Sequence, residues 1–90
     1  MRRIEITGRF KRDYKREKRT DAALDDALQP VIDMLAADEA LPVNLSDHAL
    51  SGNWKGFRDC HVKPDLVLIY EKPDEVLSLV RLGSHSELFG

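Results

Sequence analysis

The chain has 90 residues, of which 42% are hydrophobic and 33% are charged, and its formal net charge is −2. This length supports one domain with one core, residues 1–90, and no stretch approaches the roughly 18 apolar residues that a membrane span requires. The N-terminal residues lack the apolar run of a secretory signal, and Cys60 alone cannot form an intramolecular disulfide. We therefore expect a cytoplasmic protein with no membrane partner.

The charge is unevenly distributed along the chain. Residues 1–20 contain nine Lys and Arg against three acids, whereas residues 21–50 contain seven acids and no Lys or Arg. The basic segment between Arg9 and Arg19 can attract a polyanion such as RNA by releasing its counterions, or it can be a solvated helix face. Both interpretations stay open at this point.

The N-terminal third predicts a strand and two helices. Ile4 and Ile6 alternate with polar residues, which is typical of a short strand with one buried face. Residues 9–19 carry only Phe10 and Tyr14 as large apolar side chains, at a spacing of four, which predicts a charged helix with a narrow contact stripe. Residues 38–53, rich in turn-forming residues, are predicted to be an ordered loop.

Thr20 and Asp21 are candidate N-caps of the second helix. Pro30 predicts a kink or a restart within that helix, because proline removes a backbone donor. The apolar face of the helix consists of Leu24, Leu28, Val31, Ile32 and Leu35.

Three strand-like runs follow, at residues 54–62, 65–71 and 76–83, joined by segments of turn composition. The predicted order is β-α-α-β-β-β with a short C-terminal turn, an α+β fold. Because the last three strands are joined by short connections, we expect a small antiparallel sheet covered on one face by the two helices.

The antiparallel meander makes a geometric prediction about the polar residues. His61 and Asp65 flank the first hairpin turn, and pairing Glu71 with Val76 gives paired residue numbers that sum to about 147. In that register Asp65 faces Leu82. Four polar groups are then expected at one end of the sheet, namely His61, Asp65, Arg81 and His85. His48, from the preceding loop, can join them.

Such a group suits RNA cleavage by internal transesterification. A base removes the proton of the ribose 2′-hydroxyl, an acid protonates the leaving 5′-oxygen, and a cation offsets charge on the phosphorane. Histidine, with an ordinary pKa of about 6.5, can perform either proton transfer near neutrality. Arg81 can hold phosphate oxygens.

A zinc site is the alternative interpretation of the same side chains, because three histidines and a carboxylate form an acceptable ligand set. Spacing argues against it, since Pro64 between His61 and Asp65 disfavours a helical metal motif. We therefore expect no metal and no cofactor. Outside this group, Cys60 is expected to be inert.

Aromatic and basic residues near these histidines have two interpretations. Trp54, Phe57 and Tyr70 are expected to pack in the core, although an exposed aromatic ring can stack on a base. The candidate substrate-binding residues are Phe89, Lys55 and Arg58.

The segment from Asp47 to Tyr70, DHALSGNWKGFRDCHVKPDLVLIY, resembles the signature DHxLxGxWKGxRDxHVxPDxxLIY of YafQ-type toxins in the RelE/ParE superfamily. The end of the chain from Arg81, RLGSHSELF, is similar to the family's closing R-x-G-[ST]-H-x-x-L-F. Ala49 departs from a common proline and Leu66 from an occasional tryptophan.

The resemblance implies a toxin of a type II toxin–antitoxin system, a ribosome-dependent endoribonuclease that cuts mRNA without a metal. Its implied partners are a cognate antitoxin, the ribosome and mRNA, with DNA contacted only indirectly through the antitoxin complex. The alternatives are a ParE-like inhibitor of DNA gyrase and a non-catalytic module that binds RNA or protein.

The resemblance also assigns roles to site residues. We expect His85 to be the general acid, Asp65 or His48 the base, and His61 with Arg81 the groups that stabilise the phosphate. Phe89 also falls on a position of the family's active site.

Overall fold

The computed structural model describes residues 1–90. The helices and strands, in chain order, are β1 (Arg3–Ile6), α1 (Gly8–Thr20), α2 (Leu24–Ala36), β2 (His48–Ala49), β3 (Arg58–Lys63), β4 (Leu66–Glu71), β5 (Val76–Gly83) and α3 (His85–Phe89). Single 3₁₀ turns lie at Val43–Leu45 and Gly52–Trp54. The predicted α+β fold class is confirmed. The structure adds the short strand β2 within the predicted loop and a five-residue helix where a C-terminal turn was expected.

The five strands form one sheet in the order β1-β5-β4-β3-β2. The last three strands are an antiparallel meander, as predicted. The sheet as a whole is mixed, because β1 runs parallel to β5. The helical crossover of α1 and α2 returns the chain to the starting end of β1, which is the connection that a parallel pair requires.

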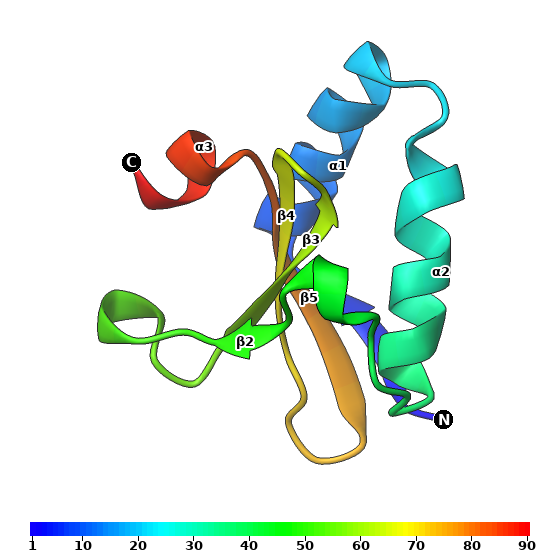
Figure 1. Ribbon diagram of the computed structural model, residues 1–90, viewed down its shortest axis with the longest axis vertical. Helices are drawn as coiled ribbons and strands as arrows, with labels where there is room; N and C mark the ends of the chain where they lie inside the picture. The colour runs from blue at the N-terminus through cyan, green and yellow to red at the C-terminus, as the bar shows by residue number, and fades with distance from the viewer.

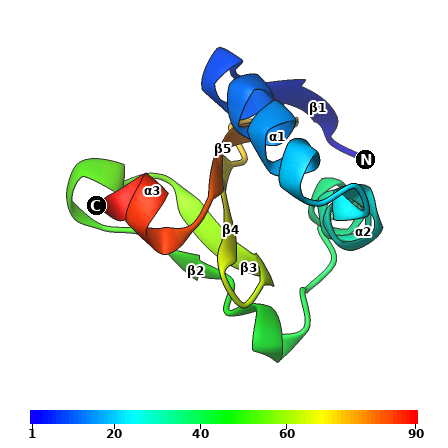
Figure 2. The same ribbon diagram turned by 90° about the horizontal axis from the view of Figure 1, so that it is seen from above.

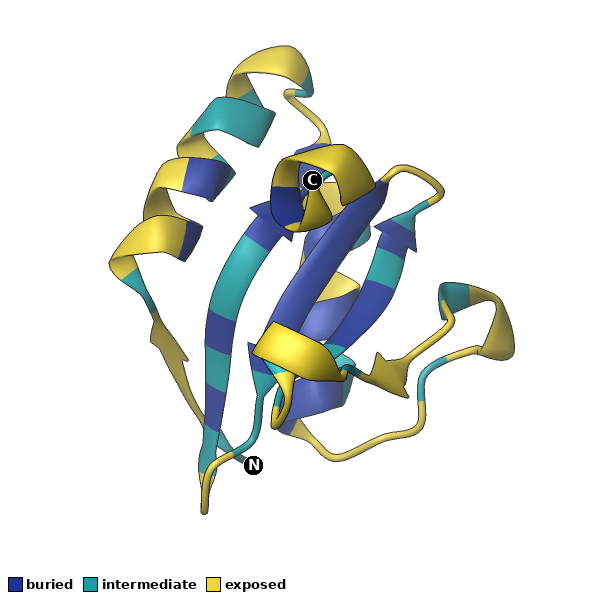
Figure 3. Cartoon of the chain, turned by 90° about the vertical axis from the view of Figure 1, so that its left-hand side faces the viewer, coloured by how far each residue is buried: buried dark blue, intermediate teal, exposed yellow.

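The two faces of the sheet are covered by different elements. Helices α1 and α2 lie on one face, and α3 with the loop after β2 lies on the other (Figures 1 and 2). The central strand β4 is buried along almost its whole length (Figure 3). Alternate side chains of β4 therefore enter two clusters, with Leu68 and Tyr70 on the helical side and Val67 and Ile69 on the α3 side.

The helix boundaries differ from the prediction at one cap. Thr20 is the last residue of α1, and the Asp21 N–H donates to the Glu17 carbonyl, so neither residue is the N-cap of α2. The predicted restart at Pro30 is also wrong, since α2 runs from Leu24 to Ala36 without interruption. Apolar side chains on both sides of Pro30 are buried against the sheet, which holds the helix together across the missing donor.

The third strand begins later than expected, at Arg58 and not at Trp54. Gly52 and Gly56 have φ of +65° and +95°, which favour glycine and turn the chain away from the sheet. Trp54 and Phe57 consequently pack against the α3-side cluster from outside the strand.

The predicted β4–β5 register is wrong by about three residues. Leu68 pairs with Leu82 and Val67 with Gly83, so paired numbers sum to 150 and Asp65 does not face Leu82. Glu71 pairs with Ser78 and not with Val76, and a β-bulge between Ile69 and the next residue of β4 adds one more residue to the shift.

Candidate active site

The candidate site lies on the sheet face opposite α1 and α2. Asp59 and His61 alternate with core residues of β3, so both project to this face, and His48 of β2 pairs with Asp59 across the strands. Val67 pairs with both His61 and Gly83, which places the start of α3 beside the His61 end of β3. This alignment of His61, Val67 and Gly83 across the three strands brings His85 next to His61.

The ring of His61 lies 5.6 Å from the ring of His85, measured between centroids. Phe89, one turn further along α3, lies 5.1 Å from His85, and its edge contacts Trp54 at 6.4 Å. Trp54 in turn packs against Phe57 at 5.5 Å, edge to face. The chain of aromatic rings fixes the position of α3 over the sheet, with Phe89 37% exposed at its outer side.

His48 is held from its Nδ1 atom. Nδ1 lies 2.6 Å from the Ser46 carbonyl oxygen, in hydrogen-bonding geometry, and 3.2 Å from Oδ1 of Asp59. Both neighbours are acceptors, so Nδ1 carries the hydrogen and Nε2 keeps its lone pair. His48 thus presents a free acceptor nitrogen on a side chain that is 53% exposed.

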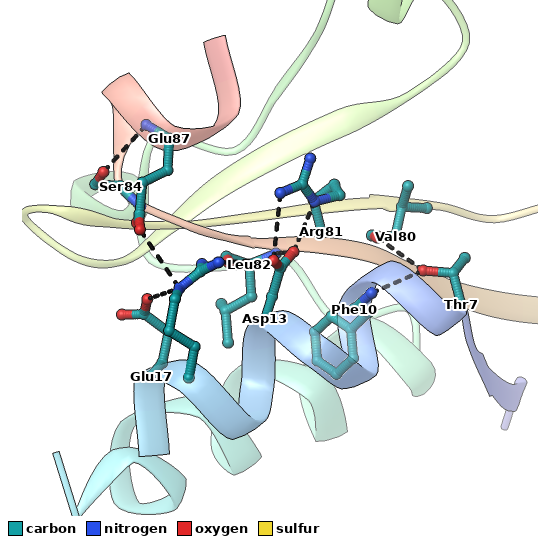
Figure 4. Close-up of polar contacts among 10 residues, drawn as sticks. Thr7, Phe10, Asp13, Glu17, Val80, Arg81, Leu82, Ser84 and Glu87 are labelled. Carbon is teal, nitrogen blue, oxygen red and sulfur yellow. Dashed lines mark hydrogen bonds and ion pairs between the residues drawn. The ribbon is translucent and has the colours of Figure 1, made fainter. Parts of the chain in front are cut away.

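Helix α3 is fixed by its own cap and by α1. The Ser84 side chain accepts from the Glu87 N–H, and the Glu87 carboxylate accepts from the Ser84 N–H, which makes a capping box. The same carboxylate lies 3.4 Å from Nε of Arg16 on α1 (Figure 4). The cap N–H and Arg16 hold the pKa of Glu87 below its usual value.

Arg81 is tied to a buried carboxylate. Its Nε and Nη2 donate to the two oxygens of Asp13 at 2.6 and 3.2 Å (Figure 4). Burial alone raises the pKa of Asp13, but the Arg81 hydrogen bond, the Leu82 N–H and the charge of Arg16 outweigh it, and the net pKa is lowered. Arg81 pairs with Ile69, a residue of the α3-side face, but makes no hydrogen bond to the histidines.

The remaining predicted residues form no hydrogen bond or ion pair with the histidines. Asp65 is exposed in the turn between β3 and β4 and forms no hydrogen bond or ion pair. Lys55 is exposed after the turn that contains Trp54. Arg58 pairs with Tyr70, a residue of the helical-side core, and its Nε lies 3.3 Å from Asp47.

Asp59 is the site residue that sequence reasoning missed. It is 1% exposed, and it lies between Arg58 and Cys60 in a segment for which only a strand was predicted. The available signal was its spacing of two from His61, which places both side chains on one face of a strand. The position of Leu66 is also informative, because its side chain is buried in the helical-side core and not at the site.

The chain was compared with known proteins. Residues 2–90 match the family described as the bacterial toxin of type II toxin–antitoxin systems, YafQ. The chain therefore belongs to the YafQ family of bacterial toxins.

Individual relatives agree with this assignment over the whole length. The chain is 36% identical over 90 residues to the mRNA interferase toxin YafQ of Escherichia coli K12, covering all of this chain and 98% of that protein. The toxin in the E. coli DinJ–YafQ toxin–antitoxin complex is 37% identical with a TM-score of 0.89, and both chains are fully covered.

A copper-bound mutant toxin from Helicobacter pylori is 43% identical with a TM-score of 0.94, covering 99% of this chain and 100% of that one. In the present chain, no group of three or more His, Cys, Asp and Glu side chains is arranged to hold a metal ion. No helix has both the length and the apolar character needed to cross a membrane.

Proposed function

We propose that this toxin is an endoribonuclease that cleaves mRNA on the ribosome by metal-independent acid–base chemistry. The observation that carries the proposal is the pair of imidazoles of His61 and His85, 5.6 Å apart, with His48 on the same face of the sheet. Two imidazoles at this separation can reach the leaving oxygen and a charged phosphate oxygen of one phosphodiester. The E. coli K12 relative is named an mRNA interferase, which agrees with this chemistry.

The proposed reaction is an internal transesterification. A base takes the proton of the ribose 2′-hydroxyl, the 2′-oxygen bonds to the adjacent phosphorus, and the bond from phosphorus to the 5′-oxygen breaks. The leaving oxygen takes a proton from the acid, which leaves a cyclic phosphate and a 5′-hydroxyl. No metal ion or cofactor takes part in this balance.

We assign the acid to His85 and the base to His48 or Asp65, with His61 and Arg81 stabilising phosphate charge. The free Nε2 of His48 supports this residue as the base, because its Nδ1 is already engaged by the Ser46 carbonyl. Asp65, which has no hydrogen-bond partner in the chain, remains the alternative base at the hairpin tip. Phe89, partly exposed beside His85, is placed to stack on a base.

The exposure of the histidines supports dependence on the ribosome. The histidines lie on an open surface, so the chain itself offers little to align the 2′-oxygen with the phosphorus, and alignment is a large part of the barrier. Five cations of α1 are exposed and form no ion pair, which suits binding to ribosomal RNA phosphates: Arg9, Lys11, Arg12, Lys15 and Arg19. Lys55 and Arg58 are proposed to add to binding of the mRNA.

The proposed partner is a cognate antitoxin, because the family belongs to type II toxin–antitoxin systems and the E. coli relative forms a complex with DinJ. A groove of about 350 Å³ runs between β1, α1 and α2, and Ile6, Phe10, Tyr14, Leu28 and Ile32 supply most of its apolar lining. Apolar side chains of an antitoxin with acidic flanks suit this groove beside the basic helix. DNA is reached only through that complex.

The test uses toxin that has been treated with EDTA and then freed of it, added to ribosomes and a translated mRNA in their Mg²⁺ buffer. We expect cleavage with ribosomes and none of free RNA, and the cognate antitoxin stops it. His85→Ala lowers the rate by about 10²- to 10⁴-fold, the usual contribution of a positioned acid, without unfolding the chain. Asp33→Asn, on the exposed face of α2, is the matched control and retains full activity.

Full activity of His85→Ala contradicts the assignment of the acid. Loss of wild-type cleavage when only the toxin has been treated with EDTA, and its recovery when a transition metal is returned to the toxin, contradict the metal-independent mechanism. Intact mRNA together with DNA damage in cells that express the toxin supports the gyrase inhibitor, and ribosome binding without cleavage supports the non-catalytic module.

A further inference from the structure

Asp59 is a buried carboxylate whose hydrogen bonds are incomplete. It lies in the middle of β3 at 1% exposure, and its Oδ1 atom has no hydrogen-bond partner. A buried polar atom that lacks a partner destabilises the fold, and more so when it is charged, so its presence requires an explanation. The core itself supplies none, because an apolar residue would fill this position of the strand.

The surroundings of Asp59 are three histidines from three elements. His48 of β2 brings Nδ1 to 3.2 Å from the unpartnered oxygen, His61 is two residues further along β3, and His85 faces it from α3. Burial raises the pKa of Asp59, the charges of the three histidines lower it, and Asp47 raises it again. The group is therefore an electrostatic partner of the whole histidine set.

We propose that Asp59 is a positioning residue that acts through His48. Its carboxylate stabilises the imidazolium that forms when Nε2 of His48 takes the proton of the 2′-hydroxyl. The proposal rests on the proposed function above.

The Ser46 carbonyl and the Asp59 carboxylate act on Nδ1 of His48 in different ways. The hydrogen bond from Nδ1 goes to the Ser46 carbonyl, and the distance to Asp59 is that of an ion pair without hydrogen-bond geometry. The Ser46 carbonyl therefore fixes the tautomer, and Asp59 contributes negative charge. When Nε2 gains its proton, the new positive charge lies beside a carboxylate that little water can screen, so the attraction is strong. Asp59 itself takes up no proton in this step, as in other Asp-oriented histidine bases.

Asp59→Asn tests this role, because it removes the charge and nearly preserves the shape. We expect kcat for cleavage of ribosome-bound mRNA to fall roughly 10- to 100-fold with KM little changed, since the charge acts on a reacting histidine and not on binding. The pH–rate profile is expected to change as well, because the imidazolium loses its counter-ion. Asp33→Asn is the control for the substitution itself.

A double-mutant cycle separates action through His48 from a structural role. In a His48→Ala background, Asp59→Asn is expected to have little further effect on kcat, whereas independent roles give additive losses. Thermal unfolding of each variant verifies that the fold is retained. Wild-type kcat and an unchanged pH profile in Asp59→Asn, or full additivity in the cycle, overturn the proposal.

A measurement without substrate keeps this test apart from the proposed function. Nitrogen-15 NMR of the wild-type toxin is expected to show neutral His48 protonated on Nδ1. In Asp59→Asn its ring signals shift, and in Asp33→Asn they do not. If the toxin does not cleave mRNA but these shifts occur, the proposed function fails while the Asp59–His48 pairing holds. If the signals are unchanged in Asp59→Asn, the pairing itself is refuted.

Discussion

Asp13 and Asp59 are the two buried acids of the chain, and their surroundings are opposite. Both oxygens of Asp13 are used, by Arg81, Arg16 and the Leu82 N–H. One oxygen of Asp59 is unpartnered and its only charged attractions come from histidines. The first residue stabilises the fold, and the second is placed to serve chemistry at a cost in stability.

The removal of Asp13 tests its structural role. Asp13→Ala leaves the guanidinium of Arg81, whose side chain is only 15% exposed, without its carboxylate and leaves the Leu82 N–H without its acceptor. We expect a loss of about 3 kcal/mol in the free energy of unfolding, measured by urea denaturation. Asp33→Ala on exposed α2 should change it by less than about 0.5 kcal/mol. An equal effect of both substitutions would show that the Asp13 network contributes nothing.

At the scale of elements, α1 completes the edge of the sheet. β1 ends opposite Leu79, so the last residues of β5 pair with β4 on one side and have no strand on the other. Side chains of α1 and its cap pair the exposed backbone instead: Thr7 donates to the Val80 carbonyl, Asp13 accepts from the Leu82 N–H and Arg16 donates to the Leu82 carbonyl (Figure 4). This arrangement protects the edge and positions the segment that leads into α3.

Pro30 is the weak point of α2. Its missing N–H leaves the Asp26 carbonyl without the usual helical donor, although the helix is continuous. Because Pro30 is exposed, Pro30→Ala removes no core contact, and we expect stabilisation by about 1–2 kcal/mol after allowing for the greater freedom of the unfolded chain. Urea denaturation measures it, with exposed Gln29→Ala as control. A destabilised Pro30→Ala variant would show that proline shapes the helix for its packing.

At the scale of the whole molecule, the sheet separates stability from chemistry. The larger core lies on the face that α1 and α2 cover, and α3 lies on the opposite face (Figure 1). The histidines lie on the α3 side of the sheet. A partner bound in the groove between α1 and α2 therefore leaves the histidines open, unless it also reaches around the sheet. The Asp13–Arg81 pair and the Arg16–Glu87 pair connect the two sides.

The pH dependence of stability follows from the carboxylates. The pKa values of Asp13 and Glu87 are lowered in the fold, so their contributions are present above about pH 4 and are lost as pH falls through the folded values. The pKa of Asp59 is raised, so its contribution is largest at low pH and is lost as pH rises. Calorimetry between pH 3 and 8 should show the melting temperature falling below about pH 4.

Two variants test which carboxylate causes each part of this pH dependence. Asp13→Asn should flatten the decline in acid, whereas Asp59→Asn should gain stability relative to the wild type as pH rises above about 4. A melting temperature that does not vary with pH would contradict both assignments.

The local patterns were sufficient for the element order, because alternation in β1 and the helical spacing of α2 depend only on neighbouring residues. β5 was predicted with its observed bounds, Val76–Gly83. Local patterns do not specify how two strands align across a turn, so the predicted β4–β5 register was wrong. Trp54 was predicted to lie in a strand, but the turns at Gly52 and Gly56 place it outside the strand. The continuity of α2 at Pro30 depended on burial of its apolar face, which is a tertiary effect.

The sequence by itself determined the family, the fold class and the histidines on which the proposed chemistry rests, because residue types and short spacings carry that information. Tertiary structure decided which of these residues meet. The pairing of β3, β4 and β5 brings His61 beside His85. Packing of α1 against β5 lets Arg81 donate to Asp13. Tertiary structure also buried Asp59 beside the histidines, because the burial of a charged side chain is decided only when the surrounding elements pack together.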